Sequence, residues 1–235
     1  MVKVLLGTPA YGGKIHVDYF NTVIGFYRVG GVQLTVMHIG NESLIQRARN
    51  KLITFFIEGD FDYLFFLDAD VALPSTALSR LLSHQLDIVG VPVPLKGFVN
   101  NKPVYNIGKI LGVKENGLLK VEYIGTAALL ISRNVAEKIK VAYKDKRYSH
   151  YLTYYRGFDD NKNLPANDLK IYDVFVPRRE GDILLSEDFA FCKDMQKLGF
   201  DTYADALIPA RHCGDFYFEG CYWNDYLQDL EKKEL

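Results

Sequence analysis

The feature that most constrains the fold is an apolar run that stops abruptly at two carboxylates. Residues 63–67 are all apolar or aromatic, and Asp68, Ala69 and Asp70 follow directly. Such a run predicts a buried strand of a parallel sheet, with the aspartates at its carboxyl end. Open α/β sheets bind ligands at that edge, and two hard oxygen donors there favour a divalent metal and a phosphate-bearing nucleotide. The alternative is a plain strand-ending turn, because Asp favours turns.

Length and charge limit the classes of protein to which the chain can belong. Its 235 residues suffice for one α/β domain, which we expect to span residues 1–235. The net charge of −1 gives no overall attraction to nucleic acid or to an anionic membrane. Apolar segments are too short for a signal peptide or a membrane span. The three cysteines show no CxxC spacing, which indicates a reducing, cytoplasmic compartment.

The first strand is expected at residues 2–6, and a loop that begins at Gly7 follows it at the same sheet edge. The loop contains Thr8, Pro9, Ala10 and Tyr11 and lacks the GxGxxG spacing, so a dinucleotide-binding Rossmann motif is not supported. A flexible loop with two glycines explains the pattern equally simply. Its place after the first strand favours contact with a ligand.

Two helices are expected on either side of the aspartates. The first, at residues 44–57, has an apolar stripe with Arg49 at its edge and Asn50 on the other side. Arg49 must snorkel, find a partner or bind a phosphate. The second, at residues 73–84, has Pro74 near its first turn, where proline is tolerated.

The second half of the chain adds three candidate features. Residues 142–180 are irregular and rich in tyrosine and charge, and we interpret them as an acceptor-side or lid loop. Glu187 and Asp188 stand in the first turn of a helix, where acids also suit the helix dipole. His212 is a lone histidine in a turn, and by itself is better explained as a structural residue.

Taken together, these motifs resemble those of the GT-A-fold glycosyltransferases, which use nucleotide-sugar donors. The similarity is to the small soluble members found in phage, large viruses and bacteria. It covers nearly the whole chain in the family's order, except for residues 142–180. The matching segments are Thr8-Pro9-Ala10-Tyr11-Gly12, Ala48-Arg49-Asn50, residues 64–71, Gly125-Thr126-Ala127, residues 185–192 and His212-Cys213-Gly214. The resemblance implies a Rossmann-like, three-layer α/β/α sandwich with a mostly parallel central sheet.

The resemblance also implies a role for each matching residue. Asp70 and His212 would bind Mn²⁺ or Mg²⁺, and Asp68 would reach the metal through water or contact the donor ribose. Asp188, or its neighbour Glu187, would act as the catalytic base beside the acceptor hydroxyl. The donor itself would lie against Thr8, Pro9, Ala10, Tyr11, Arg49, Asn50, Asp68, Ala69, Gly125 and Thr126.

The implied activity is metal-dependent transfer of a hexose or pentose from a nucleotide-diphosphate donor, a UDP-sugar first of all. The acceptor would be a glycan hydroxyl or, although the net charge does not indicate it, a modified DNA base. The expected location is the cytoplasm of a bacterium or an infected host. One alternative is a sugar-nucleotide nucleotidyltransferase, of which Gly12-Gly13-Lys14 is a faint sign. Another is a non-catalytic module that binds nucleotide or carbohydrate.

Overall fold

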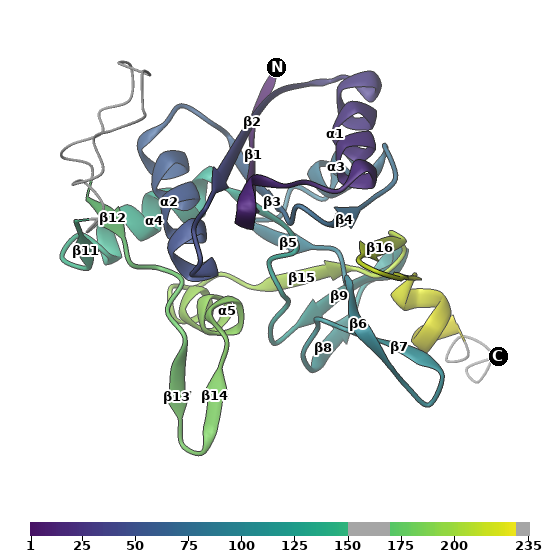
Figure 1. The fold of residues 1–235 in the computed structure, drawn as a ribbon. Coiled ribbons are helices and arrows are strands. Elements are labelled where there is room, and N and C mark those ends of the chain that lie inside the picture. The colour runs from purple at the N-terminus through teal and green to yellow at the C-terminus, as the bar shows by residue number, and fades with distance from the viewer. Residues whose placement is uncertain (150–169, 229–235) are drawn as a thin grey trace.

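The computed structural model describes residues 1–149 and 170–228, and its centre is an eight-stranded sheet (Figure 1). Two strands, β10 and β9, run opposite to the other six, so the sheet is mixed but mostly parallel, as predicted. In spatial order the strands are β2 (Val32–Gly40), β1 (Val2–Ala10), β3 (Tyr63–Leu67), β10 (Ala128–Ser132), β5 (Ile88–Gly90), β15 (Thr202–Asp205), β9 (Leu118–Val121) and β8 (Ile110–Val113).

Helices cover both faces of this sheet and make three layers (Figure 1). Side chains alternate along each strand, so Leu5 of β1 packs into one core cluster while Val4 and Leu6 pack into the other. The first cluster includes residues of α2 (Ile45–Glu58), α4 (Arg133–Ala142) and α5 (Glu187–Lys197), and the second includes residues of α1 (Val17–Val29) and α3 (Ala77–Ser83). The predicted three-layer α/β/α architecture is therefore confirmed.

A second, smaller sheet lies beside the end of β3. It has the order β17 (Tyr217–Gly220), β16 (Ala210–Cys213) and β4 (Val71–Ala72), and His212 stands opposite Val71 in its register. A separate hairpin of β6 (Pro94–Val99) and β7 (Lys102–Tyr105) lies nearby. This small sheet brings a segment near the end of the chain next to Asp70.

Two predicted segments differ from the structure or extend beyond its described part. The helix expected at residues 73–84 begins only at Ala77, because a turn that starts at Pro74 follows β4 and occupies its expected start. The predicted loop at 142–180 contains the short pair of β11 (Arg147–Tyr148) with β12 (Ile171–Tyr172). It ends in β13 (Arg178–Glu180), which pairs with β14 (Ile183–Leu185) just beyond it. Its middle lies outside the described residues. Over the described ranges, no helix is long and apolar enough to cross a membrane.

Candidate active site

The Asp68–Asp70 turn is fixed to the sheet on both sides. The Asp68 amide donates to the carbonyl of Ala127 at 3.0 Å, and the Cys213 amide donates to the carbonyl of Asp70 at 2.7 Å. The His16 amide donates to the carbonyl of Ala69 at 2.8 Å, which ties the loop after β1 to the same turn. These bonds hold the two carboxylates at the carboxyl edge of β3, where the sequence predicts them.

Asp70 and His212 converge on each other. The Oδ2 atom of Asp70 lies 3.3 Å from Nε2 of His212 and 2.7 Å from Nζ of Lys96. Burial would raise the pKa of Asp70, but the hydrogen bonds with His212 and Lys96 outweigh burial and hold the pKa at about 2. Asp70 is therefore ionised throughout the neutral pH range.

This pair fits a divalent cation. Nδ1 of His212 lies 3.0 Å from the carbonyl of Pro94, so with an ion bound, a neutral ring with its proton on Nδ1 would turn the lone pair of Nε2 toward the ion beside Asp70. Metal–ligand bonds of roughly 2.1 Å place neighbouring ligand atoms about 3 Å apart. The separation of the two donor atoms matches that spacing, and an oxygen and an imidazole nitrogen are donors that Mn²⁺ accepts.

Asp68 has a different partner, because Arg49 lies between it and Glu187. One terminal nitrogen of Arg49 is 3.4 Å from Oδ2 of Asp68, and the other donates to Oε1 of Glu187. Burial raises the pKa of Asp68, and the positive charge of Arg49 offsets only part of that rise. Arg49 therefore joins the metal-side turn to the first turn of α5, and its side chain is only 6% exposed.

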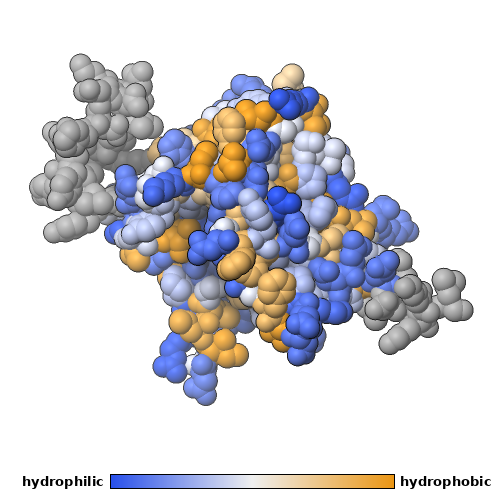
Figure 2. Space-filling model, turned by 45° about the vertical axis from the view of Figure 1, so that its right-hand side comes forward, coloured by the Kyte–Doolittle hydropathy of each residue, from blue (hydrophilic) through white to orange (hydrophobic). Residues whose placement is uncertain are grey.

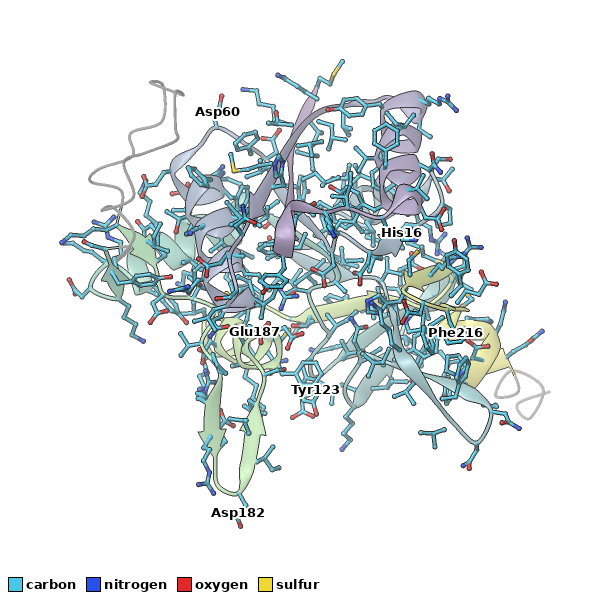
Figure 3. The ribbon with its side chains drawn as sticks, in the orientation of Figure 1. His16, Asp60, Tyr123, Asp182, Glu187 and Phe216 are labelled. Carbon is cyan, nitrogen blue, oxygen red and sulfur yellow. The ribbon has the colours of Figure 1, made fainter. Side chains whose placement is uncertain are left out.

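The two candidate bases, Glu187 and Asp188, differ in the hydrogen bonds that already occupy their carboxylate oxygens. Glu187, labelled in Figure 3 at the start of α5, is held by Arg49. Asp188 uses only its Oδ1 atom, which accepts from the Ser186 hydroxyl and from the Phe189 amide at 2.8 Å. In the described part of the chain, nothing is hydrogen-bonded to Oδ2 of Asp188.

A cavity of about 460 Å³ opens beside the aspartates, within the range of small-ligand sites. Gly12 and Gly13 adopt positive φ angles of 72° and 66°, which lets the chain turn sharply after β1 at the cavity's edge. The lining residues that the sequence predicts are Pro9, Tyr11, Asp68, Ala69 and Asp70, and the others are Lys14, Ile15, His16, Glu42, Ser43 and Ile45. His16 is labelled in Figure 3 beside the first helix.

Other predicted donor-binding residues do not line this cavity. Thr8 and Ala10 are buried in β1, and the Thr8 hydroxyl lies 2.6 Å from that of Tyr19. The Asn50 amide oxygen accepts from the backbone of Val174 and Phe175. A donor-binding role for these three residues remains a prediction.

The predicted loop at Gly125 and Thr126 is also buried. A Cβ atom on Gly125 would lie 2.5 Å from the side-chain amide nitrogen of Asn106 and 3.0 Å from its Cβ, so Asn106 packs closely against this glycine. Thr126 is fully buried, and its hydroxyl has no hydrogen-bond partner in the described part of the chain. A role for both in binding the donor sugar stays a prediction.

Two lysines lie near the aspartates: the sequence does not point to Lys96, and it gives only a faint sign of Lys14. Lys14 carries a local signal, since it follows the two loop glycines. Lys96 carries none, because only the packing of β6 beside the small sheet brings it to Asp70. His16 and Asp18 form a further potential metal group with Cys213, with ligand atoms all within 4.8 Å of one another.

Each member of that further group already has a structural contact. Nδ1 of His16 accepts from the Asp18 amide, and the Asp18 carboxylate lies 3.5 Å from Arg211. Burial and the nearby Asp18 charge raise the pKa of the Cys213 thiol to about 11. We place the candidate metal at Asp70 and His212 instead, because Asp70 lines the cavity beside the aspartates and neither Asp18 nor Cys213 does.

Comparison with known proteins supports the fold. No protein-family model and no curated protein matches the chain. Among solved structures, A197 from STIV matches 91% of this chain and 87% of its own, with 18% identity and a TM-score of 0.53. This match confirms the predicted GT-A type of fold and, at that identity, shows the fold alone.

Two partial matches have lower scores. TarS 1-349 from S. aureus is 13% identical, covers 58% of this chain and 48% of that one, and has a TM-score of 0.38. The inositol-1-phosphate CTP transferase from T. maritima is 13% identical, covers 58% of this chain and 73% of that one, and has a TM-score of 0.37. Neither of these partial matches bears on the reaction.

Proposed function

We propose that the protein is a metal-dependent glycosyltransferase that takes a sugar from a nucleotide-diphosphate donor, with a UDP-sugar as the first candidate. The observation that carries this proposal is the convergence of the Asp70 carboxylate and the His212 imidazole, 3.3 Å apart. It lies beside a ligand-sized cavity, which Asp68 and Asp70 line together with the loop after β1. A metal at this edge of an α/β sheet suits a diphosphate.

The proposed metal ligands are Asp70 and His212, with Asp68 contributing through water or to the ribose. The ion is Mn²⁺ or Mg²⁺, and the imidazole favours Mn²⁺. When bound, such an ion supplies positive charge that stabilises the departing nucleotide diphosphate. Pro94 fixes the imidazole through its carbonyl, so the ring needs no reorientation to use Nε2.

The nucleoside half of the donor is proposed to occupy the cavity. Tyr11 offers an aromatic ring that is 76% exposed and can stack on a base, with Pro9 beside it. Lys14, from the same loop, supplies a positive charge for the diphosphate. Arg49 is proposed to act indirectly, by fixing Asp68 and Glu187 relative to each other.

Asp188 is proposed as the base that removes the proton from the acceptor hydroxyl. Its second oxygen has no partner among the described residues, whereas Glu187 is held by the buried Arg49. The first turn of α5 also favours a negative charge at Asp188. The proposed acceptor is a glycan hydroxyl, with a modified DNA base as the alternative.

A thermal-shift screen tests this function. UDP-, GDP- and dTDP-sugars are added with and without Mn²⁺, since a ligand of the native state raises the melting temperature by mass action. We expect one nucleotide class to stabilise the protein, and only with Mn²⁺. Asp70→Asn and His212→Ala should abolish the Mn²⁺ dependence. Equal UDP binding with and without metal would contradict the ligand assignment.

The rival nucleotidyltransferase activity draws on one observation, the position of Lys14 at the cavity after the first strand. Its reaction joins a nucleoside triphosphate to a sugar phosphate and releases pyrophosphate. Incubating the protein with each triphosphate and sugar 1-phosphates, and measuring pyrophosphate, separates the two activities. Pyrophosphate release without any sugar transfer from nucleotide sugars would favour the rival.

A further inference from the structure

One carboxylate oxygen at the candidate metal site already has a cation beside it. Nζ of Lys96 lies 2.7 Å from Oδ2 of Asp70, the same oxygen that lies 3.3 Å from Nε2 of His212. Lys96 is thus in contact with the atom that the proposed metal would use. The side chains of Lys96 and Asp70 are 41% and 37% exposed, so the lysine can leave without disturbing the core.

Strand β6 places Lys96 there, together with the group that orients His212. Pro94 and Lys96 lie two residues apart on β6, whose register against β7 shifts between Pro94 and Phe98. The Pro94 carbonyl holds the imidazole, and the Lys96 ammonium contacts the carboxylate. Gly214 lies alongside, and a Cβ there would be 3.5 Å from the end of the Lys96 side chain. Both contacts to the proposed ligand pair therefore come from this one strand.

The charges at the site explain why the position of Lys96 matters for metal binding. Asp68 is balanced by Arg49, and Asp70 is balanced by Lys96. A divalent cation on Oδ2 of Asp70 would stand close to the ammonium, and the two positive charges would repel each other. The metal and Lys96 therefore compete for the same oxygen.

We infer that Lys96 is an internal counter-cation that yields its place on Asp70 to the metal and then pairs with the donor's diphosphate. This inference rests on the proposed function, because the diphosphate is the new partner. Its consequence is positive coupling between the metal and the nucleotide: each of them binds more tightly once the other is bound. Metal binding is weakened when the nucleotide is absent and strengthened when it is present.

The test measures Mn²⁺ binding directly, by the electron paramagnetic resonance signal of the free ion. The proteins are wild type, Lys96→Gln, Lys96→Arg and a control, Lys102→Gln. Lys102 lies on the paired strand β7, and its ammonium donates to the carbonyl of Asp225 instead. Without nucleotide, we expect Lys96→Gln to bind Mn²⁺ about 5–10-fold more tightly than wild type, in the range of ordinary coupling. Lys96→Arg, which keeps the charge, and Lys102→Gln should resemble wild type.

A second measurement adds UDP as the probe. UDP should strengthen Mn²⁺ binding in the wild type by about 5-fold or more, and by clearly less in Lys96→Gln. Equal or weaker Mn²⁺ binding by Lys96→Gln without nucleotide would overturn the competition. Tighter binding with an undiminished UDP effect would overturn the transfer to the diphosphate. Circular dichroism confirms that each variant is folded.

Failure of the proposed function gives a different pattern. If Asp70→Asn binds Mn²⁺ as wild type does, the metal site itself is wrong, whatever Lys96→Gln shows. If Asp70→Asn loses binding while wild type and Lys96→Gln are equal, the metal site stands and Lys96 is an ordinary surface ion pair.

Discussion

At the residue scale, Glu42 has an unusual electrostatic environment at the rim of the cavity. Its side chain is only 3% exposed and accepts from Arg47 at 2.9 Å and from Lys51 at 3.1 Å. Burial would raise its pKa, but the hydrogen bonds from Lys51 and Arg47 lower it from 4.5 to about 2. The folded state therefore favours the ionised form of Glu42.

This shift predicts a pH-dependent stability. A depressed pKa in the folded state contributes stability that is present above pH 4.5 and lost as the pH falls toward 2. We expect Glu42→Gln to lower the free energy of unfolding by about 1–3 kcal/mol at pH 7 and by clearly less at pH 3. Urea unfolding at both pH values measures this. Glu137→Gln, whose side chain is 62% exposed, is the control. An equal loss at both pH values would contradict the assignment.

The two acids at the start of α5 give a second prediction at this scale. Asp188→Asn should reduce turnover by about 10²–10⁴-fold, the usual contribution of a general base. Glu187→Gln should act through Arg49 and weaken Mn²⁺ and donor binding more than the chemical step. Nucleotide release with acceptor present gives both kcat and KM. Full activity of Asp188→Asn would contradict the assignment of Asp188 as the base.

At this scale the sequence predicts which residues belong to the site better than it predicts which side chains contact them. The two aspartates carry a local signal, because an apolar run ends at them. Their pairing with His212 depends on the register of β4 against β16, which no local pattern encodes. Lys96 shows the same limit, since its approach to Asp70 arises from β6 packing beside the small sheet.

At the element scale, α2 is anchored at its carboxyl end by Arg133. The guanidinium donates to the carbonyls of Phe56 at 2.9 Å, Ile57 at 3.2 Å and Gly59 at 2.9 Å, and to that of Phe61 at 2.7 Å. A positive charge at a helix carboxyl end is stabilising, and these carbonyls would otherwise lack partners. Arg133, the first residue of α4, thus caps the carboxyl end of α2 with hydrogen bonds.

Replacing this arginine should therefore be costly. We expect Arg133→Met to lower the free energy of unfolding by about 2 kcal/mol, and Arg133→Lys to recover only part, since an ammonium cannot reach all four carbonyls. Lys138→Met, an exposed change in the same helix, is the matched control. Chemical denaturation compares the three. Equal stability of Arg133→Met and Lys138→Met would show that the anchor is unimportant.

At this scale, helices and strands with a strong hydrophobic periodicity are predicted well from the sequence, but the pairing of the strands is not. The buried strand β3 follows from its apolar run, yet its antiparallel neighbour β10 comes from residues 128–132. The apolar segment before residue 132 predicts a strand but not its direction. Pro74 illustrates the remaining error, because proline suits a first helical turn as well as the turn that it forms.

At the scale of the whole molecule, Asp205 joins distant parts of the chain. It is fully buried, accepts from Arg80 at 2.6 Å and lies 2.8 Å from His84. These contacts fasten α3 to β15, at the far side of the sheet from β1.

In Figure 2 the surface is a mixture of hydrophilic and hydrophobic residues, with hydrophilic residues at the projecting tip of the β13–β14 hairpin.

Breaking this buried cluster should destabilise the whole protein. We expect Asp205→Ala to cost about 2–3 kcal/mol, because it removes a fully buried acceptor that binds the partly exposed Arg80 and His84. The exposed pair of Asp201 with Lys120, at 2.7 Å, is the control, and Asp201→Ala should cost less than about 1 kcal/mol. Thermal and urea unfolding measure both. Similar costs would show that Asp205 is not a principal anchor.

The position of β15 has a consequence for how the chain is made. It is the last strand of the central sheet along the sequence, yet it lies between β5 and β9. During synthesis on the ribosome, both of those edges stay open until residue 205 has emerged, and open edges invite mispairing with other chains. His212 follows within ten residues. The last strand of the central sheet and the proposed metal ligand His212 are therefore synthesised within the same short stretch of translation. A chain that stops before this stretch lacks both the completed sheet and the metal ligand.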